Sequence, residues 1–189
     1  FHFDPKGYKL VLLNSCVKHG LADSAYNDRR KSCENVAAAI CKHHPEVKSL
    51  RDANYELLDE VRGEVSKEDA LRAHYVIGEK ERVMEVSAAL EKEDYEEVGK
   101  KMYETHDGLS REYEVSCPEL DFLVDVARDC GVSGARVMGG GFGGCTINLV
   151  SQELYANFID KARKSYQEKF GKAPIVIDVV IGDGARKLC

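Results

Sequence analysis

The chain has 189 residues, of which 43% are apolar, and its 27 basic and 33 acidic residues give a net charge of −6. This composition suits one compact domain with an ordinary core, and an acidic balance offers no electrostatic footprint for nucleic acid. The longest apolar runs, such as Leu10–Leu13, are far shorter than the ~20 residues of a membrane-spanning helix, so no membrane association is expected.

The cysteines and histidines give no sign of a disulfide framework or a metal centre. Seven cysteines, an odd number, form no CxxC pair. We therefore expect reduced thiols in a cytoplasmic protein. His43 and His44 are adjacent at the polar end of a predicted helix, which is the wrong spacing for shared metal ligation. No metal-binding residue is predicted.

The first part of the chain is predicted to be one strand followed by helices. Lys9–Asn14 is a short apolar run typical of a strand, and Lys18–Gly20 reads as a polar turn. Apolar residues then recur every three or four positions from Tyr26 to Cys41, which predicts a helix. A second long helix is predicted to begin at Ser66, and a third covers Tyr95–Leu109.

The remaining part of the chain mixes helices and strands. Ser116 and Glu119 have the spacing of a capping box for a fourth helix, which Gly131 would end. Two strands, a helix and a last strand are predicted to follow, at Ala135–Met138, Cys145–Val150, Leu154–Tyr166 and Ile175–Ile181. The predicted fold class is α+β, with a helical half followed by a small sheet that has helices packed on one face.

A glycine cluster between two of these strands is the most informative feature. Glycine lacks a Cβ atom, so such a loop can bring backbone amides against phosphate oxygens, although a tightly packed hairpin loop is the competing interpretation. The pattern GxGxxG is formally present, but a strand follows it where a dinucleotide fold needs a helix, and no P-loop motif exists. The candidate phosphate-proximal residues are Gly139, Gly140, Gly141, Phe142, Gly143 and Gly144.

Three segments resemble one known family. RVMGGGFGGCT, from Arg136 to Thr146, resembles the third motif of the GHMP small-molecule kinases. LLNSCVKHGLADSAYNDRR, from Leu12 to Arg30, and YEVSCPELD, from Tyr113 to Asp121, are similar to galactokinase segments. The resemblance extends from about Lys9 to Ala185, almost the whole chain, and the segments follow the family's order.

The resemblance implies that residues 1–189 form a single GHMP kinase C-terminal domain. That domain would have a ferredoxin-like antiparallel sheet with helices on one face, plus a helical bundle half. The family's sugar-binding first motif, its PxGxGLSSSA phosphate loop, its metal ligands and its proposed Asp base belong to an N-terminal domain that this chain lacks. The resemblance therefore assigns no catalytic residue here, and we expect the chain alone to be inactive and to bind neither ATP nor magnesium.

The implied reaction of the intact enzyme transfers the γ-phosphoryl group of MgATP to the anomeric hydroxyl of galactose. Tyr26, within YNDRR, would bind the sugar. The periodicity alone favours Tyr26 as a core residue at the start of its helix. Arg29 and Arg30 could clamp a phosphate, but structural ion pairs with Asp28 and Glu34 are the favoured interpretation.

Three other functions are compatible with the sequence. A catalytically silent galactose sensor with the same fold, a GHMP kinase for N-acetylgalactosamine, and an α+β interaction domain with a glycine-rich hairpin are the alternatives. In the favoured interpretation the partners are galactose and ATP, bound together with the N-terminal domain. Gly141 would then serve close approach at an interdomain cleft, so valine there is expected to impair activity more than folding.

Overall fold

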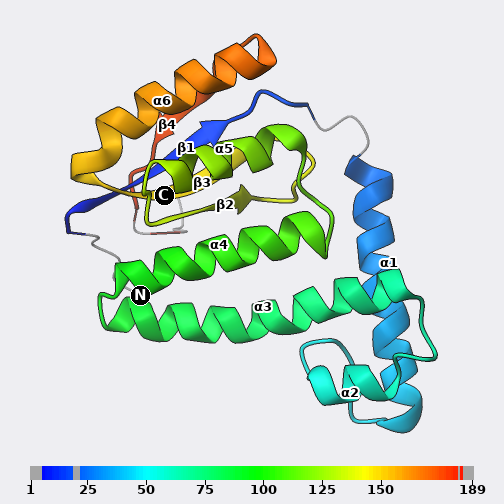
Figure 1. Cartoon of the computed structure of the whole chain (residues 1–189). Helices are drawn as coiled ribbons and strands as arrows, with labels where there is room; N and C mark the ends of the chain where they lie inside the picture. The colour runs from blue at the N-terminus through cyan, green and yellow to red at the C-terminus, as the bar shows by residue number, and fades with distance from the viewer. Residues whose placement is uncertain (1–5, 19–21, 183, 185–189) are drawn as a thin grey trace, which may run out of the picture.

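The computed structural model describes residues 6–18, 22–182 and 184. Within these residues, a run of helices separates the first strand from the second, and one more helix precedes the last strand (Figure 1). The helices and strands are β1 (Tyr8–Asn14), α1 (Ala22–His43), α2 (Tyr55–Glu60), α3 (Lys67–Glu91), α4 (Tyr95–Arg111), α5 (Pro118–Asp129), β2 (Gly134–Met138), β3 (Cys145–Ser151), α6 (Gln152–Phe170) and β4 (Ile175–Asp178).

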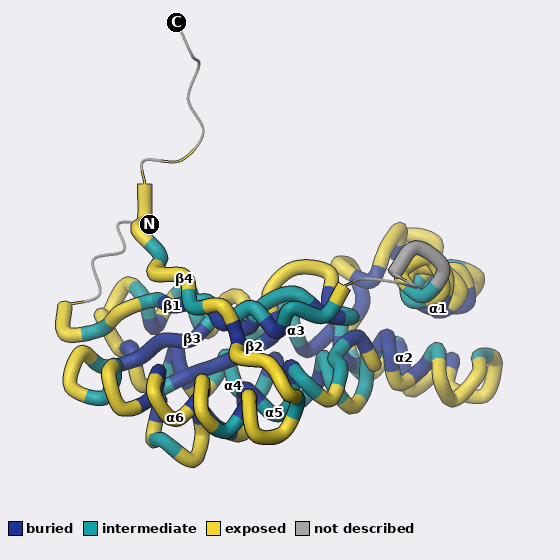
Figure 2. Tube along the Cα trace, turned by 90° about the horizontal axis from the view of Figure 1, so that it is seen from above, coloured by how far each residue is buried: buried dark blue, intermediate teal, exposed yellow. Residues whose placement is uncertain are grey.

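The four strands form one antiparallel sheet in the order β2-β3-β1-β4. Together with α5 and α6 they make the β-α-β-β-α-β arrangement of a ferredoxin-like fold, with α1 to α4 inserted after β1. Helices α5 and α6 lie on one face of the sheet (Figure 2) and bury a core against it. Fully buried members of this core are Val11, Leu13, Leu123, Phe158 and Tyr166. The predicted sheet with helices on one face is confirmed.

The inserted helices make the helical half. Helices α3 and α4 run antiparallel beside β2, and α1 crosses the far end of α3, where α2 also packs (Figure 1). This half has its own core, which includes Val36, Ile40, Leu58, Ala73 and Ile77. The predicted long helices are therefore confirmed, whereas the short α2 was not predicted. Its N-cap is Asn54, whose side-chain oxygen accepts a hydrogen bond from the Leu57 amide.

The ends of α5 confirm one prediction and correct another. Gly131 follows the helix at φ 71°, the left-handed conformation predicted for its stop. The predicted capping box is wrong, because the N-cap is Cys117 and the Ser116 hydroxyl donates to the Asp121 carboxylate at 2.5 Å. A capping box needs the Ser116 oxygen to accept from a first-turn amide, whereas here its hydroxyl donates to a charged acceptor, Asp121.

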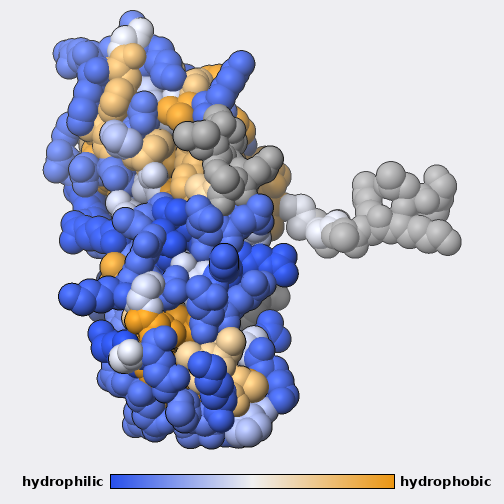
Figure 3. Space-filling model, turned by 90° about the vertical axis from the view of Figure 1, so that its right-hand side faces the viewer, coloured by the Kyte–Doolittle hydropathy of each residue, from blue (hydrophilic) through white to orange (hydrophobic). Residues whose placement is uncertain are grey.

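On the side where α1 lies, the apolar surface is divided by hydrophilic residues (Figure 3). Figure 3 shows the side on which α1 lies, where a hydrophilic band separates two apolar patches. Among the described residues, no helix has the length and hydropathy needed to cross a membrane. The six cysteines that the structure describes are free thiols.

Contact between the two halves depends on paired glycines. A Cβ atom added at Gly99 on α4 would lie 2.1 Å from the Ser133 carbonyl oxygen, and one added at Gly134 on β2 would lie 2.4 Å from the Gly99 Cα. Neither backbone can retreat without separating the helix from the strand. The absence of side chains at these two positions therefore lets α4 lie directly against β2.

We predict that Gly99→Ala destabilises the protein by about 2 kcal/mol or more, because overpacking outweighs the ~1 kcal/mol of helix propensity that alanine adds. Gly63→Ala is the matched control, since a Cβ there would meet nothing within 4 Å. Urea unfolding followed by circular dichroism measures both variants. Equal unfolding free energies for the two would show that the close approach is not needed.

Candidate functional site

The glycine loop (Gly139–Gly144) connects the antiparallel strands β2 and β3. The cluster is therefore a hairpin loop in its topology. Five of its residues have positive φ. The values are 81° at Gly139, 80° at Gly141, 60° at Phe142, 136° at Gly143 and 77° at Gly144. Because side chains rarely adopt this conformation, the glycine content is required by the backbone path of the loop.

Two neighbouring segments fasten the inner side of the loop. The Phe142 amide donates to the Val115 carbonyl at 2.6 Å, and the Gly144 amide donates to the Val17 carbonyl at 3.4 Å. Ser15 donates to the Gly144 carbonyl with both its amide and its hydroxyl, each at 2.8 Å. A Cβ atom at Gly141 would lie 2.1 Å from the Val115 oxygen. The close approach at Gly141 is therefore to this chain's own backbone, and its role at an interdomain cleft stays a prediction.

The outer side of the loop is open. Gly139 and Gly140 are exposed, and a Cβ atom at either would meet nothing within 4 Å. Among the residues that the structure describes, the amides of Gly139, Gly140, Gly141 and Gly143 donate no hydrogen bond to the backbone. Successive amides in such turns form concavities that suit anions. The loop thus combines a fastened inner side with free donors.

The three segments that resemble galactokinases meet at this loop. Ser15 and Val17 come from the first segment, Val115 from the second, and the loop itself is the third. Each segment also holds one non-glycine residue at positive φ, namely Cys16 at 57°, Glu114 at 53° and Phe142 at 60°. Backbone strain of this kind persists only where surrounding contacts fix it, and it concentrates at functional sites. His19 and Gly20 of the first segment lie outside the described residues.

Tyr26 lies in the first turns of α1 and is 60% exposed. The core interpretation of this side chain is therefore wrong, and its phenol is open to solvent. One turn later, Arg29 places its guanidinium carbon 5.4 Å from the centroid of the Phe142 ring, so α1 contacts the glycine loop close to Tyr26. Arg30 pairs with Glu34 at 2.8 Å as expected, whereas Arg29 turns instead to Glu114 and the neighbouring carbonyls.

A carboxylate supports the segment that holds the loop. Asp121 lies 3.3 Å from the buried His106 ring nitrogen, and it accepts hydrogen bonds from Ser116 and from Ser110 at 3.1 Å. Burial raises the pKa of the Asp121 carboxyl, but hydrogen bonds from His106, Ser116 and Ser110 outweigh burial and leave that pKa below its ordinary value. The sequence does not reveal this role of Asp121, because the spacing of Ser116 and Glu119 predicts a capping box instead.

Comparison with known proteins shows which proteins this chain is similar to. The model for the C-terminal region of GHMP kinases matches residues 86–168. The galactokinase of Homo sapiens is 43% identical over 98% of this chain and 45% of its own length. The galactokinase of Clostridium beijerinckii is 40% identical over 96% of this chain and 47% of its own length. The chain thus spans about half the length of the curated relatives it matches.

Solved structures give the same fold. The crystal structure of Lactococcus lactis galactokinase complexed with galactose superposes with a TM-score of 0.89 at 27% identity, covering 98% of this chain and 48% of that chain. L. major mevalonate kinase in complex with R-mevalonate superposes with a TM-score of 0.59 at 23% identity, covering 90% of this chain and 41% of that chain. The second likeness shows the fold alone.

We predict opposite outcomes for two adjacent glycines. Gly141→Ala should lower the unfolding free energy by ~1–3 kcal/mol, because the new Cβ meets the Val115 carbonyl at positive φ. Gly140→Ala should stay within about 0.5 kcal/mol of the parent. Thermal and urea unfolding compare the two variants. Equal stabilities would contradict the fastened inner side.

A second prediction concerns Asp121. A carboxylate whose pKa is depressed by folding stabilises the protein above its unfolded pKa of about 4, and this contribution is lost as the pH falls through the folded value. Asp121→Asn should therefore lower stability at pH ~7 by roughly 0.5–1 kcal/mol, since solvent screens a carboxylate that is 41% exposed, and the difference from the parent should shrink below pH ~4. Asp125→Asn, on the exposed side of α5, is the control. A difference that persists unchanged at acid pH would refute the assignment.

Proposed function

We propose that this chain works as the C-terminal part of an ATP-dependent kinase for galactose, because residues 86–168 match the GHMP kinases C-terminal model and galactokinases match almost the whole chain. The observation that carries the proposal is the meeting of the three galactokinase-like segments at one strained, glycine-rich loop. In this proposal residues 1–189 act as a single C-terminal domain beside an N-terminal domain, and the complete enzyme is cytoplasmic.

The candidate residues bind two different substrates in this proposal. Tyr26 offers an exposed phenol that can donate or accept one directional hydrogen bond to a sugar hydroxyl. The free amides at Gly139 and Gly140 fit the acceptor oxygens of a phosphate group, which supports binding of the ATP phosphates at the open side of the loop. Both groups position substrates, and neither performs the chemistry.

We propose that magnesium is held outside the described part of this chain. Within the described ranges, no group of three or more His, Cys, Asp or Glu side chains is arranged to hold a metal ion. In our proposal the metal ligands and the catalytic base lie in the other half of the enzyme, and the chain alone binds neither ATP nor magnesium. Phosphoryl transfer depends on positioning and on charge neutralisation, so the isolated chain lacks the second requirement.

A kinase for N-acetylgalactosamine and a silent galactose sensor are the competing functions. The Homo sapiens and Clostridium beijerinckii relatives are galactokinases, and the superposed Lactococcus lactis galactokinase is complexed with galactose. These names favour galactose over its N-acetyl derivative and catalysis over sensing. Direct assay separates all three.

We predict that the chain alone produces no galactose-dependent ADP, whereas a fusion in which it replaces the matching region of human galactokinase does. The fusion restores the half that this chain does not contain, with 43% identity supporting the exchange. Phosphorylation of N-acetylgalactosamine in place of galactose would favour the alternative kinase. Galactose binding by calorimetry without turnover would favour a sensor.

We also predict that Tyr26→Phe in this fusion raises the KM for galactose by about two- to tenfold, since the loss of one neutral hydrogen bond costs ~0.5–1.5 kcal/mol. The KM for ATP should stay near its parental value. Steady-state kinetics with each substrate varied in turn measures both constants. An unchanged galactose KM and kcat would remove Tyr26 from the sugar site.

A further inference from the structure

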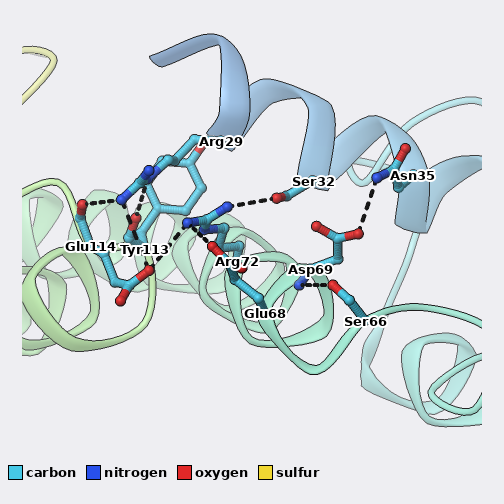
Figure 4. A network of polar contacts seen from close by, with 9 residues as sticks. All are labelled: Arg29, Ser32, Asn35, Ser66, Glu68, Asp69, Arg72, Tyr113 and Glu114. Atoms are coloured by element: carbon cyan, nitrogen blue, oxygen red, sulfur yellow. Dashed lines mark hydrogen bonds and ion pairs between the residues drawn. The ribbon is translucent and has the colours of Figure 1, made fainter. Parts of the chain in front are cut away.

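Arg29 reaches from α1 to two other segments at once. Its side chain is only 13% exposed. Its Nε donates to the Tyr113 carbonyl at 3.0 Å, and its Nη2 donates to the Glu114 carbonyl at 2.6 Å (Figure 4). Its guanidinium carbon lies 5.4 Å from the centroid of the Phe142 ring in the glycine loop. One side chain therefore touches both the loop and the segment that fastens it.

That segment, residues 112–117, connects α4 to α5, and we call it the linker. Within it Glu114 has a φ of 53°, a conformation that a side chain adopts only where contacts impose it. The next residue, Val115, receives the Phe142 amide on its carbonyl and donates its own amide to the Leu109 carbonyl at 2.9 Å. The conformation of Glu114 thus sets the direction of the carbonyl that holds the loop.

A second arginine fixes the side chain of the same glutamate. Arg72 on α3 is 6% exposed, and its Nη2 lies 3.2 Å from the Glu114 carboxylate and also pairs with Glu68. Its Nη1 donates to the Ser32 hydroxyl on α1 at 2.9 Å. Figure 4 shows Arg29 and Arg72 side by side against Glu114. The two cations hold both the backbone and the carboxylate of the strained residue.

Arg29 also lies one turn after Tyr26 on α1. The contacts that hold Arg29 in place therefore also hold the helical turn that carries the exposed Tyr26 phenol. The Nε and Nη2 of Arg29 donate to carbonyls of the linker, which orients the guanidinium toward the linker and disfavours a phosphate clamp. We propose that Arg29 is a positioning residue that couples the Tyr26 end of α1 to the glycine loop through the linker. Its effect on catalysis rests on the proposed kinase function, whereas the coupling itself is a property of this chain.

The test is hydrogen exchange at single amides in the 189-residue chain, measured by NMR. Arg29→Gln removes the fork of charged donors, and the matched control is Arg30→Gln, which removes the adjacent, exposed arginine that pairs only with Glu34 among the described residues. We expect the Phe142 amide to exchange at least tenfold faster in Arg29→Gln, with the buried Leu149 amide of β3 unchanged. Arg30→Gln should change neither amide by more than about twofold. Arg29→Lys, which keeps a charged donor, should restore part of the protection.

Two results would overturn the coupling. One is parental exchange at Phe142 in Arg29→Gln. The other is equal acceleration at Phe142 and Leu149, which would mean that Arg29 serves only global stability. If Arg29→Gln does not fold, Arg29→Lys supplies the same comparison with a smaller expected change at Phe142.

Kinetics in the fusion with human galactokinase tests the consequence for catalysis. We expect kcat in Arg29→Gln to fall at least tenfold while the thermal midpoint stays within a few degrees of the parent, and Arg30→Gln to keep parental kcat. Faster Phe142 exchange with unchanged kcat would overturn the positioning role. A parental fusion without kinase activity would refute the proposed function instead, and the exchange data would still decide whether Arg29 couples the helix to the loop.

Discussion

The hydrogen bond from the Phe142 amide to the Val115 carbonyl is the contact on which the candidate site depends. It joins the β2–β3 hairpin to the linker that leaves the helical half, two regions that meet at few other backbone positions near the loop. It forms only because Gly141 has no Cβ atom, since that atom would lie 2.1 Å from the same carbonyl oxygen. The hydrogen bond therefore requires glycine at residue 141, and this requirement is the constraint on the loop.

This constraint explains how one loop can be rigid and still open to a ligand. Gly141 and Gly143 face the Val115 and Val17 backbones, while Gly139 and Gly140 face open space. The inner residues set the path of the loop, and the outer residues leave free donors on it. A loop whose conformation is fixed before a ligand arrives loses less entropy on binding, which is the advantage of preorganised positioning in phosphoryl transfer.

The sequence predicted those features that depend on periodicity or on one residue's backbone preference. The stripe of Leu120, Leu123 and Val124 on α5 is fully buried, and Gly131 ends that helix as predicted. The position of Tyr26 was mistaken, because a three-to-four spacing gives the direction of a helix face and does not say whether a neighbour covers it. Helix α2 is too short for its spacing to have predicted it.

The supports of the site could not be predicted, because most of them join residues far apart in the chain and the Ser116–Asp121 contact follows no spacing rule. The capping-box spacing at Ser116 does not show that Asp121 will accept a hydrogen bond from its hydroxyl. Nothing near Arg29 shows that Tyr113 and Glu114 will turn their carbonyls toward it. The family resemblance identified the three segments that meet, but it did not show which atoms join them. Nothing in the sequence around Gly141 indicated that Val115 is the residue it approaches closely.

The most direct measurement is the scalar coupling across the hydrogen bond between the Val115 carbonyl carbon and the Phe142 amide nitrogen, observed by NMR in the unmodified chain. The account predicts a detectable coupling, together with slow exchange at Phe142 and fast exchange at the open Gly140 amide. No coupling, with Phe142 exchanging as fast as Gly140, would contradict it.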